Sequence, residues 1–275
     1  MVVGVTSEIG ALDRVTDEKR LEALALVREG RLYDLGQVLD ENVPVFPGRH
    51  FRQTLVTTAH HSNGAGLGEN RVNWITEVFS GTTQLGTHLD SLGHLQIGER
   101  GYGDLSVAEL AGSSGLTRLG AETIPQIVTR GWLVDVSARG LEEGGVITLD
   151  DVVGLDPAPG DAVLFHTGWS AHWNDPDRYL AGEPGPGYEV ADWLVEHGVA
   201  LTGCDTWSYG PVPAEDPARP FEVPQILNVR HGVFVVENLD TFALAADGVR
   251  EFAFVLTHPK LRGATGAWVS PIALV

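Results

Sequence analysis

Three stretches in the middle of the sequence read Asp161-Ala-Val-Leu-Phe-His166, Tyr188-Glu-Val-Ala-Asp-Trp-Leu-Val-Glu-His197 and Val199-Ala-Leu-Thr-Gly203. The first and third are short apolar runs, a pattern typical of strands. The second has helical character and is followed by Gly198, which is typical of a helix that ends there. A strand, a helix and a strand in this order predict a mixed α/β core rather than an all-β barrel.

Further elements are expected on both sides of this unit. Apolar runs predict strands at 31–35, 131–136, 233–237 and 251–257, and the alternation of polar and apolar residues in 72–90 suits strand pairing. Three Pro/Gly-rich stretches, at 157–160, 182–187 and 210–220, are interpreted as surface loops that are too short to be domain linkers.

The N-terminal segment is predicted to be helical over residues 16–29. Thr16 or Asp17 can cap this helix, and Gly30 can end it. Leu21, Leu24 and Ala25 are expected to form its apolar stripe. We therefore divide the chain into an N-terminal helical segment, 1–30, and a single catalytic domain, 31–275.

Composition limits the class of ligand. The chain has 275 residues and a formal net charge of −19, which argues against nucleic acid or an anionic membrane as a partner. The sequence has no apolar run of membrane-spanning length and no secretory signal pattern at its start. Its single cysteine, Cys204, excludes an intrachain disulfide and a cysteine-rich zinc site. We expect a cytoplasmic protein that binds a small molecule.

The stretch Gln84-Leu-Gly-Thr-His88-Leu-Asp90-Ser-Leu-Gly-His94 carries the most chemistry. On a strand, His88 and Asp90 point to the same face and can share one ion. Gly93 allows a turn that brings His94 back to that site. Imidazole and carboxylate ligands suit zinc, manganese or iron, and a free histidine can move a proton. The alternative is a polar turn with two ordinary histidines.

Gly86-Thr-His88-Leu-Asp90 followed by His94 resembles the G-T-H-x-D-x-x-x-H signature of the cyclase family of metal-dependent hydrolases, which includes bacterial kynurenine formamidases and isatin hydrolases. Further similar stretches follow in the family's order: Asp34-Leu, Val43–Gly48, Gly131–Val136, Pro159–Trp169, Gly203–Ser208 and Glu237-Asn-Leu. The resemblance implies the swivelling β/β/α fold, a mixed sheet core with flanking helices. It also implies a homodimer or homotetramer, in which the N-terminal segment packs on a neighbouring subunit.

Two glutamines depart from the formamidase pattern. Gln84 and Gln225 stand where that pattern has histidines, so two nitrogen ligands of a binuclear zinc site are missing. This departure resembles the isatin hydrolase branch, which binds one manganese. The resemblance implies one divalent ion, manganese before zinc, held by His88, Asp90 and Gln225. It gives His94 the role of acid and base.

The resemblance leaves open the roles of other side chains around this site. Glu237 matches a ligand of the two-metal enzymes, and with one metal it lies behind the ligands without touching the ion. Gln84 is a weak ligand, a substrate contact or a structural amide. Phe46, Trp74 and Trp207 either line a pocket for a flat aromatic substrate or belong to the core.

Three further candidates lie outside this motif. The pair His60-His61 is interpreted as solvated or as a substrate contact on a loop, and His166 as a hydrogen-bonded structural residue. Cys204 is not expected to be a nucleophile, because Asp205 beside it disfavours a thiolate.

The resemblance implies hydrolysis of a carbon–nitrogen bond in an amide, with an aromatic or cyclic amide as the first choice of substrate. Two alternatives remain open. The same metal site could hydrolyse a lactone or close a ring. Alternatively, Gln84 and Gln225 could mark a protein that binds a metal-chelating ligand without turning it over.

Overall fold

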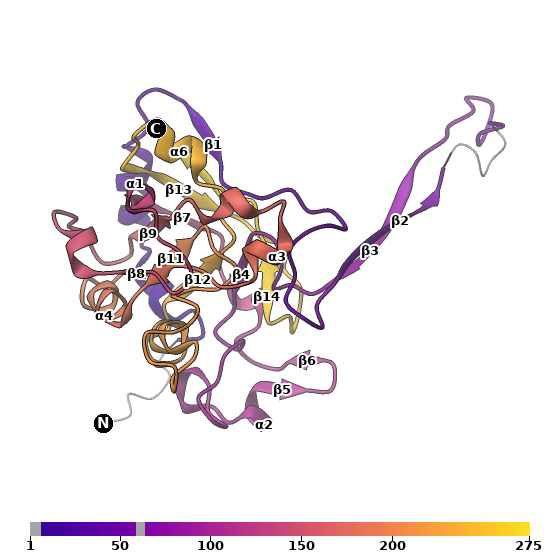
Figure 1. Cartoon of the computed structure of the whole chain (residues 1–275). Coiled ribbons are helices and arrows are strands. Elements are labelled where there is room, and N and C mark those ends of the chain that lie inside the picture. Colours follow the sequence, from indigo (N-terminus) through magenta and orange to yellow (C-terminus); the bar gives the residue numbers. More distant parts are fainter. Residues whose placement is uncertain (1–6, 59–63) are drawn as a thin grey trace.

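The computed structural model describes residues 7–58 and 64–275, so the pair His60-His61 lies outside the described residues. Figure 1 shows a body built on one large mixed sheet, from which a long hairpin projects. In the described part of the chain this sheet has nine strands, in the order β1-β15-β13-β7-β9-β11-β12-β4-β14. The predicted α/β class, with a mixed sheet core and flanking helices, is confirmed.

The elements have the following bounds. The large sheet consists of β1 (Leu32–Asp34), β4 (His88–Asp90), β7 (Ile127–Asp135), β9 (Ala162–His166), β11 (Leu201–Cys204), β12 (Phe234–Glu237), β13 (Glu251–Leu256), β14 (Gly266–Trp268) and β15 (Ile272–Leu274). Three two-stranded pairs are β2 (Phe51–Thr57) with β3 (Thr76–Gly81), β5 (Ala111–Gly112) with β6 (Gly115–Leu116), and β8 (Val146–Ile147) with β10 (Gly185–Pro186). The α-helices are α1 (Asp17–Leu24), α2 (Val107–Leu110), α3 (Pro176–Tyr179), α4 (Tyr188–Glu196), α5 (Glu222–Pro224) and α6 (Phe242–Ala246). The other helical turns are η1 (Gly10–Arg14), η2 (Tyr102–Asp104), η3 (Ala121–Thr123), η4 (Ser137–Arg139), η5 (Leu149–Val152), η6 (Trp169–His172) and the π-helical η7 (Gln225–Arg230).

The centre of the sheet is parallel. Strands β7, β9, β11 and β12 run side by side in the same direction, and every residue of β9, β11 and β12 is buried. Strands covered on both faces need continuous apolar runs, which is why these segments were recognisable in the sequence. Helix α4 ends before Gly198, whose φ of +71° is the left-handed conformation expected after a helix.

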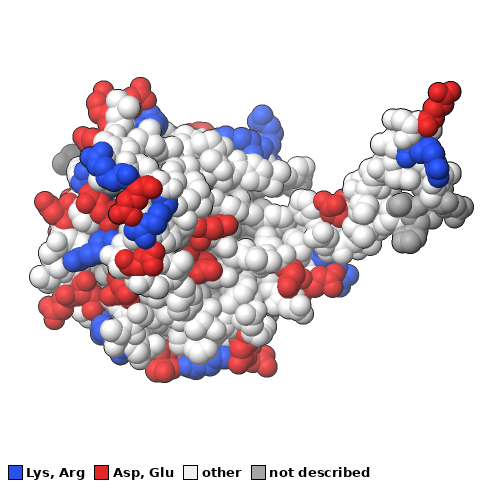
Figure 2. Space-filling model, turned by 90° about the horizontal axis from the view of Figure 1, so that it is seen from above, with Lys and Arg blue, Asp and Glu red and all other residues white. Residues whose placement is uncertain are grey.

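Antiparallel strands flank this parallel centre. On one side β13 pairs with β7 and β15, and β15 pairs with β1. On the other side β4 lies between β12 and β14. The described residues contain no helix that is long and apolar enough to cross a membrane. Charged side chains of both signs are spread over the body, and the acidic ones are prominent in Figure 2.

The predicted N-terminal helix is present, with Thr16 as its cap, but it ends at Leu24 and not at 29 before Gly30. Its predicted apolar stripe is also wrong. Leu21 is 68% exposed and Leu24 is 49% exposed. Helix α1 instead packs against β7 and β13 and buries Lys19 and Ala23. The reason is electrostatic, because Lys19 Nζ lies 2.8 Å from Oδ1 of the fully buried Asp161. Packing of segment 1–30 on a neighbouring subunit stays a prediction.

The prediction of a surface loop at residues 182–187 is also wrong, because this stretch is buried. Its backbone pairs with the chain on both sides: Gly185 N donates to Gly145 O, and Glu183 N donates to Val212 O. A Cβ on Gly185 would lie 2.6 Å from the carbonyl carbon of Gly210, so glycine is required for this close approach.

The Lys19–Asp161 pair gives a stability prediction. Asp161 Oδ2 also accepts hydrogen bonds from Trp132 Nε1 and Ala158 N, so this carboxylate is fixed in place whether or not the lysine is present. We expect Lys19→Met to lower the free energy of unfolding by about 3 kcal/mol, since it leaves a buried charge unpaired. Urea denaturation measures this change.

The matched control is Glu22→Gln, which removes the exposed carboxylate 3.5 Å from the same lysine. Its cost should stay below about 1 kcal/mol. Equal effects of the two substitutions would refute the structural role of the buried pair.

Candidate metal centre

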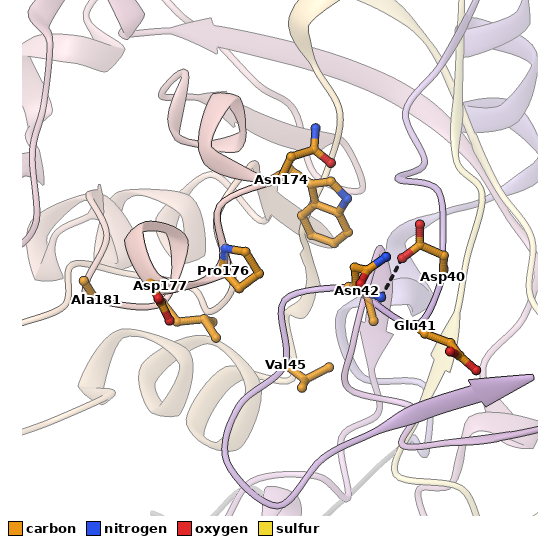
Figure 3. Close-up of a pocket in the computed structure, with 11 residues that line it drawn as sticks. Asp40, Glu41, Asn42, Val45, Asn174, Pro176, Asp177 and Ala181 are labelled. Carbon is orange, nitrogen blue, oxygen red and sulfur yellow. Dashed lines mark hydrogen bonds between the residues drawn. The ribbon is translucent and has the colours of Figure 1, made fainter.

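One open groove on the body lies away from the G-T-H-x-D stretch. This open groove of about 840 Å³ lies between residues 40–45 and 173–181 (Figure 3). Its charged lining residues are the carboxylates Asp40, Glu41 and Asp177. An acidic rim without histidine or cysteine is a solvated surface, and the groove is not lined by any residue of the G-T-H-x-D stretch.

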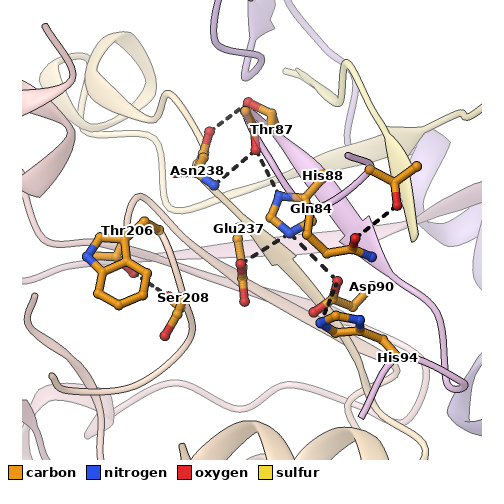
Figure 4. Close-up of polar contacts among 12 residues, drawn as sticks. Gln84, Thr87, His88, Asp90, His94, Thr206, Ser208, Glu237 and Asn238 are labelled. Carbon is orange, nitrogen blue, oxygen red and sulfur yellow. Dashed lines mark hydrogen bonds and ion pairs between the residues drawn. The ribbon is translucent and has the colours of Figure 1, made fainter. Parts of the chain in front are cut away.

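Another, smaller cavity lies at strand β4, where three ionisable side chains converge (Figure 4). His88 lies directly opposite Glu237 in the antiparallel pairing of β4 with β12. Asp90, two residues along, projects from the same face. On the other side of β4, Asp90 lies opposite Gly266, which has no side chain to crowd it. The ligand atoms of His88, Asp90 and Glu237 all lie within 4.8 Å of one another.

The donor set fits a divalent cation. His88 Nε2 lies 3.2 Å from Glu237 Oε2 and 3.6 Å from Asp90 Oδ1. All three side chains are buried, yet His88 Nε2 and Asp90 Oδ1 have no hydrogen-bond partner among the described residues. Buried polar atoms without partners are rare and costly, and these two are aimed at one point. One imidazole nitrogen and carboxylate oxygens suit zinc, manganese or iron.

A contact of its Nδ1, on the side of the ring away from the carboxylates, orients His88. Its Nδ1 lies 2.8 Å from the carbonyl oxygen of Gly86, which leaves Nε2 to face the carboxylates. Asn238 Nδ2 donates to the same carbonyl over 3.0 Å. Gly86 has a φ of +58°, and a Cβ there would collide with Leu39, so a side chain is excluded at this position.

The electrostatics of the cluster also favour a cation. Burial, together with the nearby Asp90 carboxylate, raises the pKa of Glu237. Burial works against a protonated His88, but Glu237 and Asp90 outweigh it and raise the pKa of the ring above its ordinary value. A bound positive ion would offset the crowding of negative charge that raises the pKa of Glu237.

His94 returns to this site through a tight turn. Its backbone N donates to Ser91 O over 3.0 Å, and its Nε2 lies 4.0 Å from Asp90 Oδ1. The side chain is 22% exposed and lines the cavity. The expected turn is therefore present, but Gly93 is needed for another reason. A Cβ there would lie 2.5 Å from Leu116 Cδ1, so the constraint is close packing and not a left-handed backbone.

The cavity above the cluster has a volume of about 190 Å³. Phe46 and Trp207 line it with ring centroids 5.1 Å apart, and Phe221 lies 6.4 Å from Trp207. Trp207 also belongs to a buried cluster with Trp169 and Tyr179, so it has both a wall and a core position, and contact of Phe46 or Trp207 with a substrate stays a prediction. Trp74 is 52% exposed on the projecting hairpin and does not line the cavity.

The two glutamines occupy different places. Gln84 lines the cavity, but its amide is engaged: Oε1 accepts from Thr83 Oγ1 and Nε2 donates to Thr265 Oγ1. Gln225 begins the π-helical turn η7 and is half-buried. Its neighbour Pro224 lines the cavity, whereas Gln225 itself does not. Its role as a ligand stays a prediction.

Several site residues were missed by the sequence analysis. Arg49 is the one cationic residue in the described lining of the cavity; it donates to Gln84 O over 2.6 Å, and its guanidinium lies 5.7 Å from the centre of the Phe46 ring. Ser208 presents a buried hydroxyl that lacks a hydrogen-bond partner. The Gly203–Ser208 motif pointed to Ser208, but no local pattern marked Arg49.

Glu183 was missed as well, because it lies in a Pro/Gly-rich stretch. It is fully buried, and its carboxyl accepts hydrogen bonds from Trp207 N and Ser208 N. Burial raises the pKa of Glu183 well above its ordinary value. Glu183 therefore fixes the turn that carries two residues of the cavity wall.

His166 and Cys204 lie outside the cavity. His166 is buried, with Nδ1 2.7 Å from Thr241 Oγ1, which agrees with a structural role. Burial raises the pKa of the Cys204 thiol well above its ordinary value, so this residue is a thiol and not a nucleophilic thiolate.

Comparison with known proteins places this chain in a family. Residues 33–211 match the model of the Cyclase family, described as "Putative cyclase". The chain belongs to the cyclase family. No curated protein sequence matches the chain.

Solved structures of cyclase-family proteins share this fold. A structure described as a novel cyclase has 27% identity and a TM-score of 0.87, covering 98% of this chain and 97% of that one. Isatin hydrolase A from Ralstonia solanacearum has 23% identity and a TM-score of 0.67, covering 89% and 92%. A predicted metal-dependent hydrolase from Bacillus stearothermophilus has 19% identity and a TM-score of 0.61, covering 90% and 98%.

The cluster predicts metal-dependent stability. An ion that binds only the folded chain raises the free energy of unfolding by about 2.7 kcal/mol at one hundred times its dissociation constant. We expect Mn²⁺ or Zn²⁺ to stabilise the chelator-treated protein in this way. Asp90→Asn and Glu237→Gln should each weaken binding at least about tenfold, since each removes a charged donor. Calorimetric titration with the metal salt measures the affinity.

The matched control is Asp151→Asn. The Asp151 carboxylate is 12% exposed and pairs with Arg139, and neither residue lines the cavity. This variant should bind the ion as the unmodified protein does. Loss of binding in all three variants, or in none, would contradict the assignment of the centre.

Proposed function

We propose that this chain is a metal-dependent amidohydrolase that opens a cyclic amide. The observation that carries the proposal is the convergence of His88, Asp90 and Glu237 on one point at the base of an aromatic-walled cavity. The structural neighbours support it, because they include proteins described as isatin hydrolases and as a metal-dependent hydrolase.

The proposed ion is a single divalent cation, manganese in preference to zinc. His88 and Asp90 hold it, Glu237 is the third donor in reach, and the Gln225 amide is the oxygen ligand that the family resemblance adds. When bound, such an ion polarises a carbonyl oxygen and lowers the pKa of a coordinated water. The chain itself contributes a desolvated site, because all three clustered side chains are buried.

His94 is the proposed acid and base. It lines the cavity, and its Nε2 lies 4.0 Å from Asp90 Oδ1, beside the clustered donors. His94 takes the proton of the attacking water as the oxygen bonds to the amide carbon. It then donates that proton to the nitrogen as the carbon–nitrogen bond breaks, so the ring opens to an amine and a carboxylic acid, which releases its own proton to solvent to become a carboxylate.

The cavity wall favours a flat substrate that yields an anion. Phe46, Trp207 and Phe221 provide apolar ring faces, which suit an aromatic or cyclic amide. Arg49 faces the same space and can bind the carboxylate that hydrolysis releases. The hydroxyl of Ser208, which lacks a partner, can donate to the amide oxygen.

A substrate panel tests the reaction. Manganese-loaded protein should hydrolyse a five-membered aromatic lactam at least about tenfold faster than a lactone of the same shape, because the site is proposed to protonate a leaving nitrogen. Product formation followed by chromatography gives the two values of kcat/KM. Faster lactone opening would instead establish the ester-hydrolysing alternative, and ring closure of the amino acid product would establish the cyclase alternative.

The remaining alternative is a protein that binds a chelating ligand without turnover. It would be supported if an aromatic keto acid bound tightly to the metal-loaded protein and no panel member was converted after long incubation. That result would overturn the amidohydrolase proposal while leaving the metal centre intact.

The metal content and the turnover of two variants, measured separately, test the role of His94. We expect His94→Ala to retain the ion and lose about 10²–10⁴ in kcat, the usual contribution of a general acid–base group. Asp90→Ala should lose both the ion and the activity. Elemental analysis of each purified variant, alongside its kcat, separates the two effects. Unchanged turnover in His94→Ala would remove this residue from the mechanism.

A further inference from the structure

Asn238, the residue that follows Glu237, has a backbone conformation that few side chains tolerate. Its φ is +56°, in the left-handed region, which strains most residues other than glycine. It is also buried, with 4% of its surface exposed. Strained residues of this kind cluster at functional sites, where the rest of the structure holds them in place. The side chain of Asn238 is therefore a candidate for a role at the metal centre.

The polar groups of Asn238 bond to three segments that are remote in the sequence. Its backbone N donates to Thr206 O over 2.8 Å, and its backbone O accepts from Thr87 Oγ1 over 2.6 Å. In the side chain, Nδ2 donates to Gly86 O over 3.0 Å, and Oδ1 accepts from the Tyr179 hydroxyl over 2.8 Å. One residue thus joins the chain before β4, helix α3 and the turn after β11.

The orientation of the amide follows from the chemistry of its neighbours. The Gly86 carbonyl can only accept, so the amide must present its NH₂ group to it. The amide oxygen then faces the Tyr179 hydroxyl, which must donate. Burial raises the pKa of Tyr179 well above its ordinary value, so this hydroxyl keeps its proton. The arrangement that satisfies both neighbours therefore aims Nδ2 of Asn238 at the Gly86 carbonyl.

This contact bears on two of the three clustered donors. The Gly86 carbonyl that accepts from Asn238 also lies 2.8 Å from His88 Nδ1. Asn238 is covalently joined to Glu237, which lies opposite His88 in the pairing of β12 with β4. Figure 4 shows Asn238 beside Thr87 and His88. A single amide thus links the residue next to one donor to the carbonyl that orients the other.

We infer that Asn238 is a positioning residue, which holds His88 and Glu237 at the spacing that a divalent ion requires. It acts through the Gly86 carbonyl and does not line the cavity itself. The inference rests on the proposed single-ion centre, but not on the reaction that this centre performs. Supporting contacts of this kind are worth about 10–100-fold in metal affinity.

Two substitutions separate the amide from the turn. Glycine suits a positive φ, so Asn238→Gly keeps the backbone course and removes only the amide. It leaves no donor stranded, because the Tyr179 hydroxyl has a second acceptor, Asp205 O, at 3.4 Å. Asn238→Ala removes the same amide and is strained at this φ. We expect each variant to raise the dissociation constant for Mn²⁺ about 10–100-fold, measured by calorimetric titration of the chelator-treated full chain.

Stability distinguishes this role from that of an ordinary turn residue. In the metal-free protein, Asn238→Gly should keep the urea midpoint of the unmodified chain, whereas Asn238→Ala should lower it. A residue needed only for the turn would give metal affinities in that same order. The control substitution is Asp104→Gly, at an exposed position with a φ of +61° that does not line the cavity. This variant should bind Mn²⁺ as the unmodified chain does.

The outcomes separate the inference from the metal centre. Normal Mn²⁺ affinity in Asn238→Gly, or an equal loss in Asp104→Gly, would overturn the inference while the centre stands. If Asn238→Gly does not fold, as judged by far-UV circular dichroism, the residue serves folding and the inference is likewise wrong. Absence of Mn²⁺ binding by the unmodified chain would instead refute the centre itself, and the inference with it.

Discussion

Two carboxylates and an imidazole are held together at one end of the sheet, away from bulk water. Such a cluster is unfavourable by itself, because each carboxylate loses solvation and repels the other. It persists because β4 is clamped between β12 and β14, with His88 opposite Glu237 and Asp90 opposite Gly266. A slip of one residue would turn His88 and Asp90 away from the site, so the centre depends on strand register more than on any single contact.

The sequence predicted those parts of the fold that local rules govern. Buried parallel strands need continuous apolar runs, so β9, β11 and β12 were visible without coordinates. The shared face of His88 and Asp90 follows from the two-residue period of a strand. The return of His94 follows from a short turn. Each of these depends on neighbours within a few positions along the chain.

What was missed depends on distant segments. The exposure of Leu21 reflects the need of buried Asp161 for the charge of Lys19, a contact between remote parts of the chain. Glu183 was hidden in a Pro/Gly-rich stretch because its function, holding the turn at Trp207, is a tertiary hydrogen bond. Glu237 lies opposite His88 because β12 pairs with β4. Nothing in the sequence indicates that these two strands pair, or in which register.

The order of the strands has a consequence for biosynthesis. The strand that carries His88 pairs with Trp268, and the first strand of the sheet pairs with the last, Leu32 with Leu274. Pairings between such remote segments form slowly and late. While the ribosome is still extending the chain, His88 and Asp90 are present without Glu237 or the strand that seats them. The three donors can therefore lie together only once the segment that carries Trp268 has been made and has paired with the strand of His88.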